Sequence, residues 1–178
     1  MRLTLAIFAV LASSIPALAQ PYAGMETRAI KTLSDKDIAD LNAGRGMGLA
    51  LAAELNGYPG PSHAIELAGR LGLSADQVAK LRAAFEAMKA EAIPLGATLI
   101  SQERNLNDDF AKRTVTLASL ETTTQQIGAT QAALRVAHLK YHIATAAILT
   151  PDQVKRYDEL RGYGGGAAPA HEHRMHHQ

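Results

Sequence analysis

The sequence predicts an all-α protein whose main element is a long antiparallel helical hairpin with short flanking helices. Apolar residues recur at alternating steps of three and four along two long segments, which is the spacing of helices with one buried face. A short connector at 111–115 separates these segments, so that the two helices fold back on each other. No segment shows the alternation of apolar and polar residues that a half-buried strand requires.

The first long segment carries its apolar stripe as far as about Phe110, which corresponds to roughly 50 Å of helix at 1.5 Å per residue. The stripe consists of Val78, Leu81, Phe85, Met88, Ala92, Leu95, Leu99, Leu106 and Phe110. Pro94 falls inside this segment, and it predicts a kink or a break because proline cannot donate the helical hydrogen bond.

The second long segment, capped by Thr116, has a poorer stripe. Its members are Leu117, Leu120, Thr124, Ile127, Gln131, Leu134, His138, Tyr141, Thr145 and Ile148. Four of them are polar where an isolated hairpin favours leucine, so this hairpin needs further apolar surface. Either the short helices or a second chain supplies that surface, and we expect a homodimer.

Two similar segments predict the starts of helices. They are Leu73-Ser74-Ala75-Asp76-Gln77-Val78 and Leu149-Thr150-Pro151-Asp152-Gln153-Val154. In each, the hydroxyl residue caps the helix and the glutamine three residues later hydrogen-bonds back to it, while the leucine packs on the valine. Pro151 stands at the first helical position, where its missing N–H group is not needed. We interpret both segments as structural capping motifs.

Shorter elements precede the hairpin. Ser34 predicts the start of a short helix that ends at the glycines of 42–48. Those glycines do not form a phosphate loop, because no strand precedes them and no Gly-Lys-Ser/Thr follows. Residues 49–55 add a helical turn or two, 56–61 form a stiff turn, and a compact helix over 63–71 ends at Gly72.

The N-terminal residues have the pattern of a secretory signal peptide over 1–19. A basic start is followed by an apolar run at 3–12, a break at 13–16 and Ala17-Leu18-Ala19 before the expected cut at Gln20. An uncleaved amphipathic anchor is the alternative. We expect an N-terminal arm with a short helix over 20–45, the hairpin domain over 46–163 and a flexible glycine- and histidine-rich tail over 164–178.

Composition excludes several classes of function. The 178 residues include 18 Lys and Arg against 17 Asp and Glu, a balance that gives no electrostatic footprint for nucleic acid. The chain has no cysteine, which excludes disulfides, thiolate metal sites and cysteine nucleophiles. It also lacks a nucleophile elbow, a His-Glu-x-x-His motif and a phosphate-binding lysine motif, so we expect no enzyme. Histidine and carboxylate would therefore carry any metal chemistry.

The helical histidines are candidate metal ligands. His138 and His142 are four residues apart and share one helix face, so that both imidazoles can approach one cation. His63 and Glu66, on the short helix, can complete such a site if that helix packs across the hairpin. The alternative is a hydrogen-bonded core histidine at 138 and a solvated one at 142.

The tail contributes four further histidines, His171, His173, His176 and His177, beyond a glycine-rich linker. A mobile tract of this kind binds divalent transition metals with little geometric selectivity. A purification tag is the alternative, which the interspersed Glu, Arg and Met residues disfavour.

The paired segments Leu73–Gln77 and Leu149–Gln153 resemble the twin LTxxQ motifs of the Spy/CpxP periplasmic stress family. The segments at 46–50, 53–61 and 157–163 are similar to its branch associated with heavy-metal sensing and resistance. The resemblance covers roughly 46–163 and implies a helical hairpin, often dimeric, in the periplasm of a Gram-negative bacterium. The first motif has serine in place of threonine, a change that capping tolerates.

This resemblance implies two candidate functions. Some members bind zinc, copper, nickel or cobalt through a histidine-bearing first helix and a His-x-x-x-His or His-x-x-x-Met pair on the last long helix. His138 and His142 match this spacing, and His63 and Glu66 match the first helix more loosely. Others are ATP-independent holdases for unfolded proteins. A client-binding face would include Phe85, Met88, Leu95, Leu99 and Phe110, residues that equally suit an ordinary core. We expect metal binding, with unfolded periplasmic proteins or a membrane-bound signalling protein as possible partners.

Overall fold

The computed structural model describes residues 22–163. The expected signal peptide and the tail with His171, His173, His176 and His177 lie outside the described residues. Within 22–163, helices account for 74% of the chain and no strand occurs, apart from an isolated bridge between Ile30 and Leu33. The prediction of an all-α fold is confirmed.

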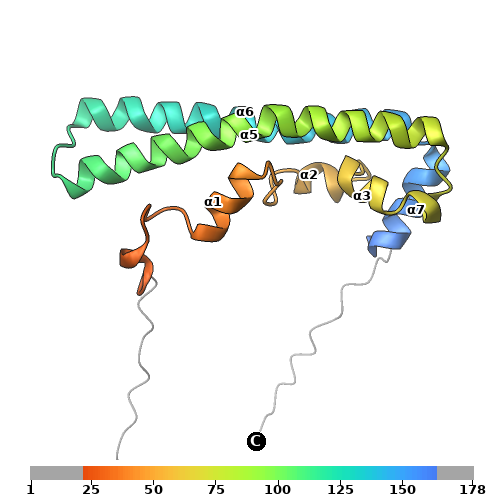
Figure 1. Cartoon of the computed structure of the whole chain (residues 1–178), viewed down its shortest axis with the longest axis horizontal. Coiled ribbons are helices and arrows are strands. Elements are labelled where there is room, and N and C mark those ends of the chain that lie inside the picture. Colours follow the sequence, from red (N-terminus) through yellow and green to blue (C-terminus); the bar gives the residue numbers. More distant parts are fainter. Residues whose placement is uncertain (1–21, 164–178) are drawn as a thin grey trace, which may run out of the picture.

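The elements follow one another as a 3-10 turn and seven helices in the described part of the chain. They are η1 (Met25–Thr27), α1 (Asp35–Asn42), α2 (Leu51–Glu54), α3 (Pro61–Glu66), α4 (Ala68–Leu71), α5 (Ala75–Ala111), α6 (Leu117–Ile148) and α7 (Pro151–Arg161). Helices α5 and α6 form the predicted antiparallel hairpin, and the remaining elements lie along one side of it (Figure 1). The single helix expected over 63–71 is divided at Leu67 into α3 and α4, and Gly72 ends α4 in the left-handed conformation as predicted.

Helix α5 continues through Pro94 without a break. The second half of α5 slopes away from α6 toward the connector (Figure 1), in keeping with the bend that a proline introduces into a helix. Glu91, one turn before Pro94, ties the two long helices together. Its carboxylate accepts a hydrogen bond from Tyr141 at 2.7 Å and pairs with Lys140 at 2.5 Å.

Both capping motifs form as predicted, and they also contact each other. The Ser74 and Thr150 hydroxyls accept from the backbone N–H groups of Gln77 and Gln153, whose side chains accept from the capping residues in return. The Gln77 amide donates to the Gln153 side chain at 2.7 Å, and Gln153 donates back at 3.2 Å. Gln77 also donates to the carbonyl of Ile148 at 3.0 Å, near the end of α6. The twin motifs therefore join the start of α5, the end of α6 and the start of α7.

Because Gln77 serves three elements, its replacement by alanine is expected to lower the free energy of unfolding by about 2 kcal/mol. This figure combines a lost cap of about 1 kcal/mol with a cost of about 1 kcal/mol for polar partners left unpaired. Ser119→Ala is the matched control, since Ser119 closes the capping box of α6 alone, with Thr116. Urea unfolding followed by circular dichroism measures both variants, and equal effects would contradict a linking role for Gln77.

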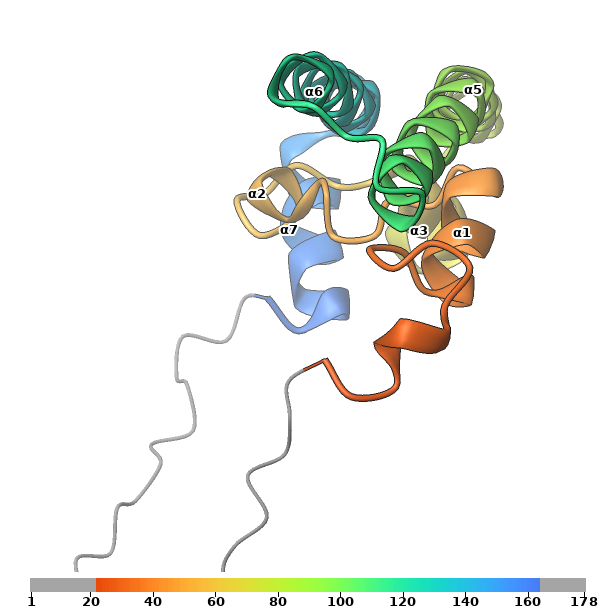
Figure 2. The same cartoon turned by 90° about the vertical axis from the view of Figure 1, so that its left-hand side faces the viewer.

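The N-terminal segment covers one face of the hairpin and supplies the apolar surface that the seam of α6 lacks. The main core cluster joins this segment to both long helices and consists of Ile30, Leu41, Ala92, Leu99, Ile100, Ile127 and Leu134. Seen along the hairpin, α1, α2, α3 and α7 all lie beneath α5 and α6 (Figure 2). A second core, at the end near the capping motifs, contains Ala64, Leu81 and Leu149. The expected dimer stays a prediction.

Candidate functional site

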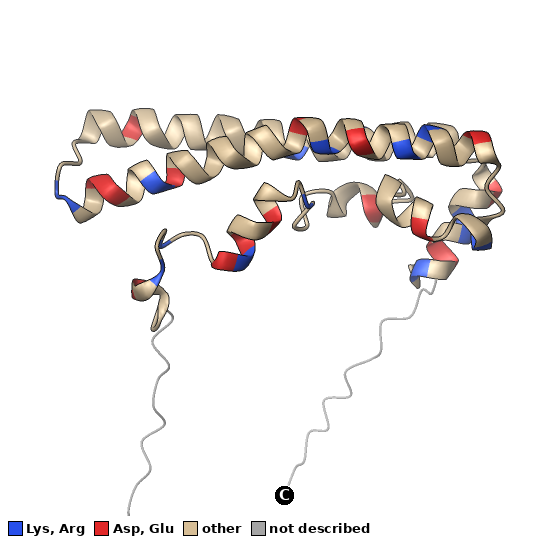
Figure 3. Cartoon of the chain, in the orientation of Figure 1, with Lys and Arg blue, Asp and Glu red and all other residues tan. Residues whose placement is uncertain are grey.

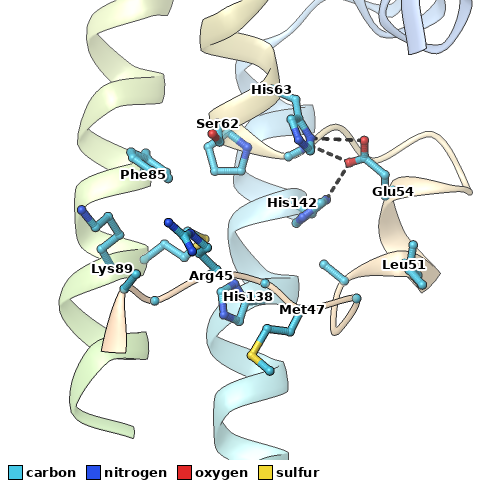
Figure 4. A pocket seen from close by; sticks show the side chains of 18 residues that line it. Arg45, Met47, Leu51, Glu54, Ser62, His63, Phe85, Lys89, His138 and His142 are labelled. Atoms are coloured by element: carbon cyan, nitrogen blue, oxygen red, sulfur yellow. Dashed lines mark hydrogen bonds and ion pairs between the residues drawn. The ribbon is translucent and has the colours of Figure 1, made fainter. Parts of the chain in front are cut away.

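A cavity of about 590 Å³ lies between the hairpin and the segment that covers it. Its wall includes the glycine-rich loop 43–48, parts of α2, α3 and α5, and one face of α6 (Figure 4). All three helical histidines, His63, His138 and His142, line this cavity together with Glu54. The structure thus brings the three predicted histidines to one place.

Glu54, in α2, is the polar centre of the site, and only 7% of its surface is exposed. Tyr157 and Tyr163 donate to its Oε1 at 2.5 and 3.2 Å, and the backbone N–H of Gly60 donates to Oε2 at 3.1 Å. The Arg161 guanidinium lies 3.5 Å from Oε1. Helix α7 and Tyr163 thereby close over a carboxylate about a hundred residues earlier in the chain.

Two of the histidines face this carboxylate. His63 Nδ1 lies 3.6 Å from Glu54 Oε1, and His142 Nδ1 lies 3.7 Å from Oε2. His142 Nδ1 also lies 2.7 Å from the carbonyl oxygen of Tyr58. Because a carbonyl oxygen only accepts, Nδ1 of His142 carries the proton and Nε2 keeps its lone pair. A Cβ atom on Gly60 would lie 3.2 Å from that Nε2, so the glycine leaves this edge of the ring uncovered.

The electrostatics keep Glu54 ionised. Burial opposes the charge, but the polar contact and charge of the adjacent His63 and the hydrogen bonds from Tyr157 and Tyr163 outweigh it and lower the pKa of Glu54 to about 2. The same burial, followed by the hydrogen bond to Glu54, raises the pKa of Tyr157. Asp158, next to this group, has a raised pKa because of burial and the charge of Glu54. Glu54 therefore supplies a buried negative charge near neutral pH.

His138 lies one helical turn before His142 on the same face, as its spacing predicts. It is only 2% exposed, and its Nε2 is buried with no hydrogen-bond partner among residues 22–163. Burial, followed by the charge of His142, lowers the pKa of His138, so that the imidazole is neutral. A neutral imidazole whose ring nitrogen has no hydrogen-bond partner can offer that nitrogen's lone pair to a cation.

Glu66 does not join the histidines. Its carboxylate accepts from the Ser62 hydroxyl at 3.3 Å and lines a separate hollow with Arg82 and Phe85. The carboxylate beside His63 is instead Glu54, which the sequence interpretation missed. One signal pointed to it, since Glu54 is the only acidic residue in the segment 53–61 that resembles the metal-associated branch.

The side chains around Glu54 include residue types that bind metals, but they do not enclose an ion. In the conformation of residues 22–163, no three His, Asp or Glu side chains stand close enough together to enclose an ion. The donor types nevertheless suit a transition metal, because the cavity combines an ionised carboxylate with imidazole nitrogens. The side chain of His63 is 40% exposed, whereas that of His142 is 10% exposed. Of these two side chains, His63 therefore has the greater freedom to adjust its position.

The family model described as LTXXQ motif family protein matches residues 62–161, which is more than half of the chain. The chain belongs to the LTXXQ motif family. This is the Spy/CpxP-type family, whose members are non-enzymatic and typically periplasmic. Neither the comparison with curated proteins nor that with solved structures gave a match. Glu54 precedes the matched residues, and assignment to the metal-associated branch of the LTXXQ family stays a prediction.

The apolar residues considered for client binding are divided between core and surface in this LTXXQ protein. Met88 and Leu99 are buried, Phe85 and Leu95 are partly buried, and Phe110 is 55% exposed. Leu99 belongs to the main core, where the N-terminal segment covers it. These five residues do not form one open face. None of the helices in residues 22–163 combines the length and apolar character needed to cross a membrane.

Proposed function

We propose that this LTXXQ protein is an exported periplasmic stress protein of the heavy-metal-resistance type, which binds a divalent transition metal in the cavity around Glu54. One observation carries the proposal: a buried, ionised carboxylate has imidazoles of His63 and His142 within 3.7 Å, and the unpartnered His138 lines the same cavity. Zinc, copper, nickel and cobalt are the ions that a donor set of imidazole and carboxylate suits.

The surrounding residues prepare these donors. The Tyr58 carbonyl holds the Nδ1 proton of His142 and thus leaves Nε2 as the ligand atom, an arrangement typical of metal-binding histidines. Tyr157 and Tyr163 orient the Glu54 carboxylate from the side of Oε1, while Oε2 faces His142. When bound, the ion would supply positive charge beside Glu54. The four tail histidines would bind further ions.

Metal binding is favoured over the holdase alternative for a structural reason. The cavity holds a convergent polar site, whereas a client could reach Met88 and Leu99 only after the covering elements had left the hairpin. Failure to suppress the aggregation of a heat-labile client at equimolar dimer would exclude the holdase function.

Titration calorimetry tests the structured site directly. The mature chain with its four tail histidines replaced by alanine is expected to bind one zinc or copper ion. His63→Ala and Glu54→Gln are each expected to weaken the affinity by about tenfold or more, because each removes a ligand. His63 is the safer variant, since its partly exposed side chain contributes little to the core.

Glu66→Gln is the matched control for Glu54→Gln, because Glu66 ends α3 as Glu54 ends α2 and lies outside the cavity. Its affinity should equal that of the parent. Binding that disappears when the tail histidines alone are replaced would confine metal binding to the tail and contradict the proposal.

A further inference from the structure

The cavity around Glu54 is much larger than a metal ion alone requires. Its volume of about 590 Å³ falls in the range of about 300 to 1,000 Å³ that is typical of sites for small organic molecules. Among residues 22–163, no three His, Asp or Glu side chains stand close enough together to enclose an ion. Because zinc usually takes four ligands, an ion bound at Glu54 would keep open positions for donor atoms from another molecule. The cavity therefore has both the space and the open metal positions that a small ligand needs.

The wall of the cavity carries an excess of positive charge. Among the described residues that line it, Arg45 and Lys89 are basic and Glu54 is the one carboxylate. This excess is local, because the whole chain has a net charge of only +1 and its acidic and basic residues are interspersed along the hairpin (Figure 3). A divalent ion at Glu54 would add two further positive charges. An anion is therefore the kind of small ligand that the metal-loaded cavity would attract.

Lys89 is the basic residue best placed to hold such an anion. It is partly buried on α5, and its ammonium group has no ion-pair partner among residues 22–163. Its Nζ lies 5.7 Å from the centre of the Phe85 ring, which also lines the cavity. Arg45 is less available, because its Nη1 already pairs with Asp40 at 2.6 Å. Figure 4 shows Lys89 on α5, across the cavity from Glu54, so that an ion at Glu54 and the Lys89 ammonium can bind different groups of one ligand.

We propose that this cavity binds its divalent metal together with a small multidentate carboxylate, as a ternary complex of chain, metal and carboxylate. Donor atoms of the small molecule fill the metal positions that the side chains leave open, and one of its carboxylate groups accepts charged hydrogen bonds from Lys89. Phe85 and Met88 make the α5 wall apolar, and an ion pair beside such a wall is less screened than in water. This inference rests on the metal binding proposed above and specifies the chemical form in which the metal is bound.

Equilibrium dialysis tests the ternary complex, with citrate as the probe because its several carboxylates can bind zinc and Lys89 together. The mature chain with its four tail histidines replaced by alanine is expected to retain one citrate per chain when one equivalent of zinc is present, and much less without zinc. Three outcomes would overturn the inference while leaving metal binding intact: zinc retained without citrate, zinc removed from the chain by citrate, or citrate retained equally without zinc. A chain that retains zinc neither with nor without citrate would overturn the proposed function as well.

Charge variants on α5 test the role of Lys89. Lys89→Gln should raise the dissociation constant of citrate from the zinc-loaded chain by about tenfold or more, because the charged hydrogen bonds are lost. The affinity for zinc alone should stay unchanged, and Lys89→Arg should retain most of the citrate binding. Lys80→Gln is the matched control, since Lys80 lies on the same helix outside the cavity and pairs with Asp76 at 2.7 Å. Equal citrate affinities for Lys89→Gln and the parent would overturn the assignment of the anion to Lys89.

Discussion

Gly96→Ala is expected to lower the free energy of unfolding by about 2 kcal/mol, although alanine is the better helix former. Helix α1 ends against α5 at this residue, and a Cβ atom on Gly96 would lie 2.5 Å from the carbonyl oxygen of Leu41. The Gly96 Cβ and the Leu41 carbonyl are both fixed to helix backbones, so neither can move aside as the end of a flexible side chain could. Either α1 shifts off the hairpin or α5 distorts, and both loosen the main core around Leu41 and Leu99. Denaturant unfolding measures the loss.

Gly69→Ala in α4 is the control for this experiment. Gly69 is also helical, but a Cβ atom there would meet nothing within 4 Å. The change should therefore be neutral or stabilising by up to about 1 kcal/mol, through helix propensity and a less flexible unfolded chain. Hydrogen exchange adds a local measurement, because the backbone amides of α1 should lose protection in the Gly96 variant alone. Unchanged protection there, with an unchanged unfolding midpoint, would show that α1 does not dock at Gly96.

Acidification is expected to remove about 2 to 3 kcal/mol of stability through Glu54 alone. The folded protein lowers the pKa of Glu54 from its ordinary value of 4.5 to about 2. A group whose pKa is depressed by folding contributes stability above its unfolded pKa, and that contribution is lost as the pH falls through the folded pKa. The loss therefore falls between about pH 5 and pH 2. Urea unfolding at a series of pH values measures it.

Glu54→Gln should flatten this part of the pH profile, because an amide keeps most of the shape of the site but does not titrate. Asp37 and Asp40 also have depressed pKa values, through hydrogen bonds from Ser34 and from Lys36 and Arg45, and they supply a remaining slope. Glu66→Gln, at a carboxylate outside the cavity, should keep the full profile of the parent. If both glutamine variants retained the parent's slope between pH 5 and pH 2, Glu54 would not be the paired carboxylate that its geometry indicates.

The local features of this chain were predictable because they depend on neighbours within a few residues. Ser34, Ser74, Thr116 and Thr150 all cap helices as expected, since a capping box requires only a partner three residues along the chain. The hairpin also formed as its apolar spacing indicated. The pairing of Gln77 with Gln153 was not predicted, because each glutamine already has a local role that accounts for its presence.

The candidate site shows most clearly the difference between what local sequence predicts and what the packing of the folded chain decides. His138 and His142 share a face because four residues make about one helical turn, and the sequence alone establishes this. The choice of Glu54 over Glu66 depends on how α2 and α7 pack beneath the hairpin, which brings Tyr157 to a carboxylate 103 residues away. The apolar spacing within a helix does not indicate which residues so far apart in the sequence will contact each other. Helices and their caps therefore follow from the sequence through short-range hydrogen bonds and apolar spacing, whereas the partners of Glu54 follow from long-range packing of the folded chain.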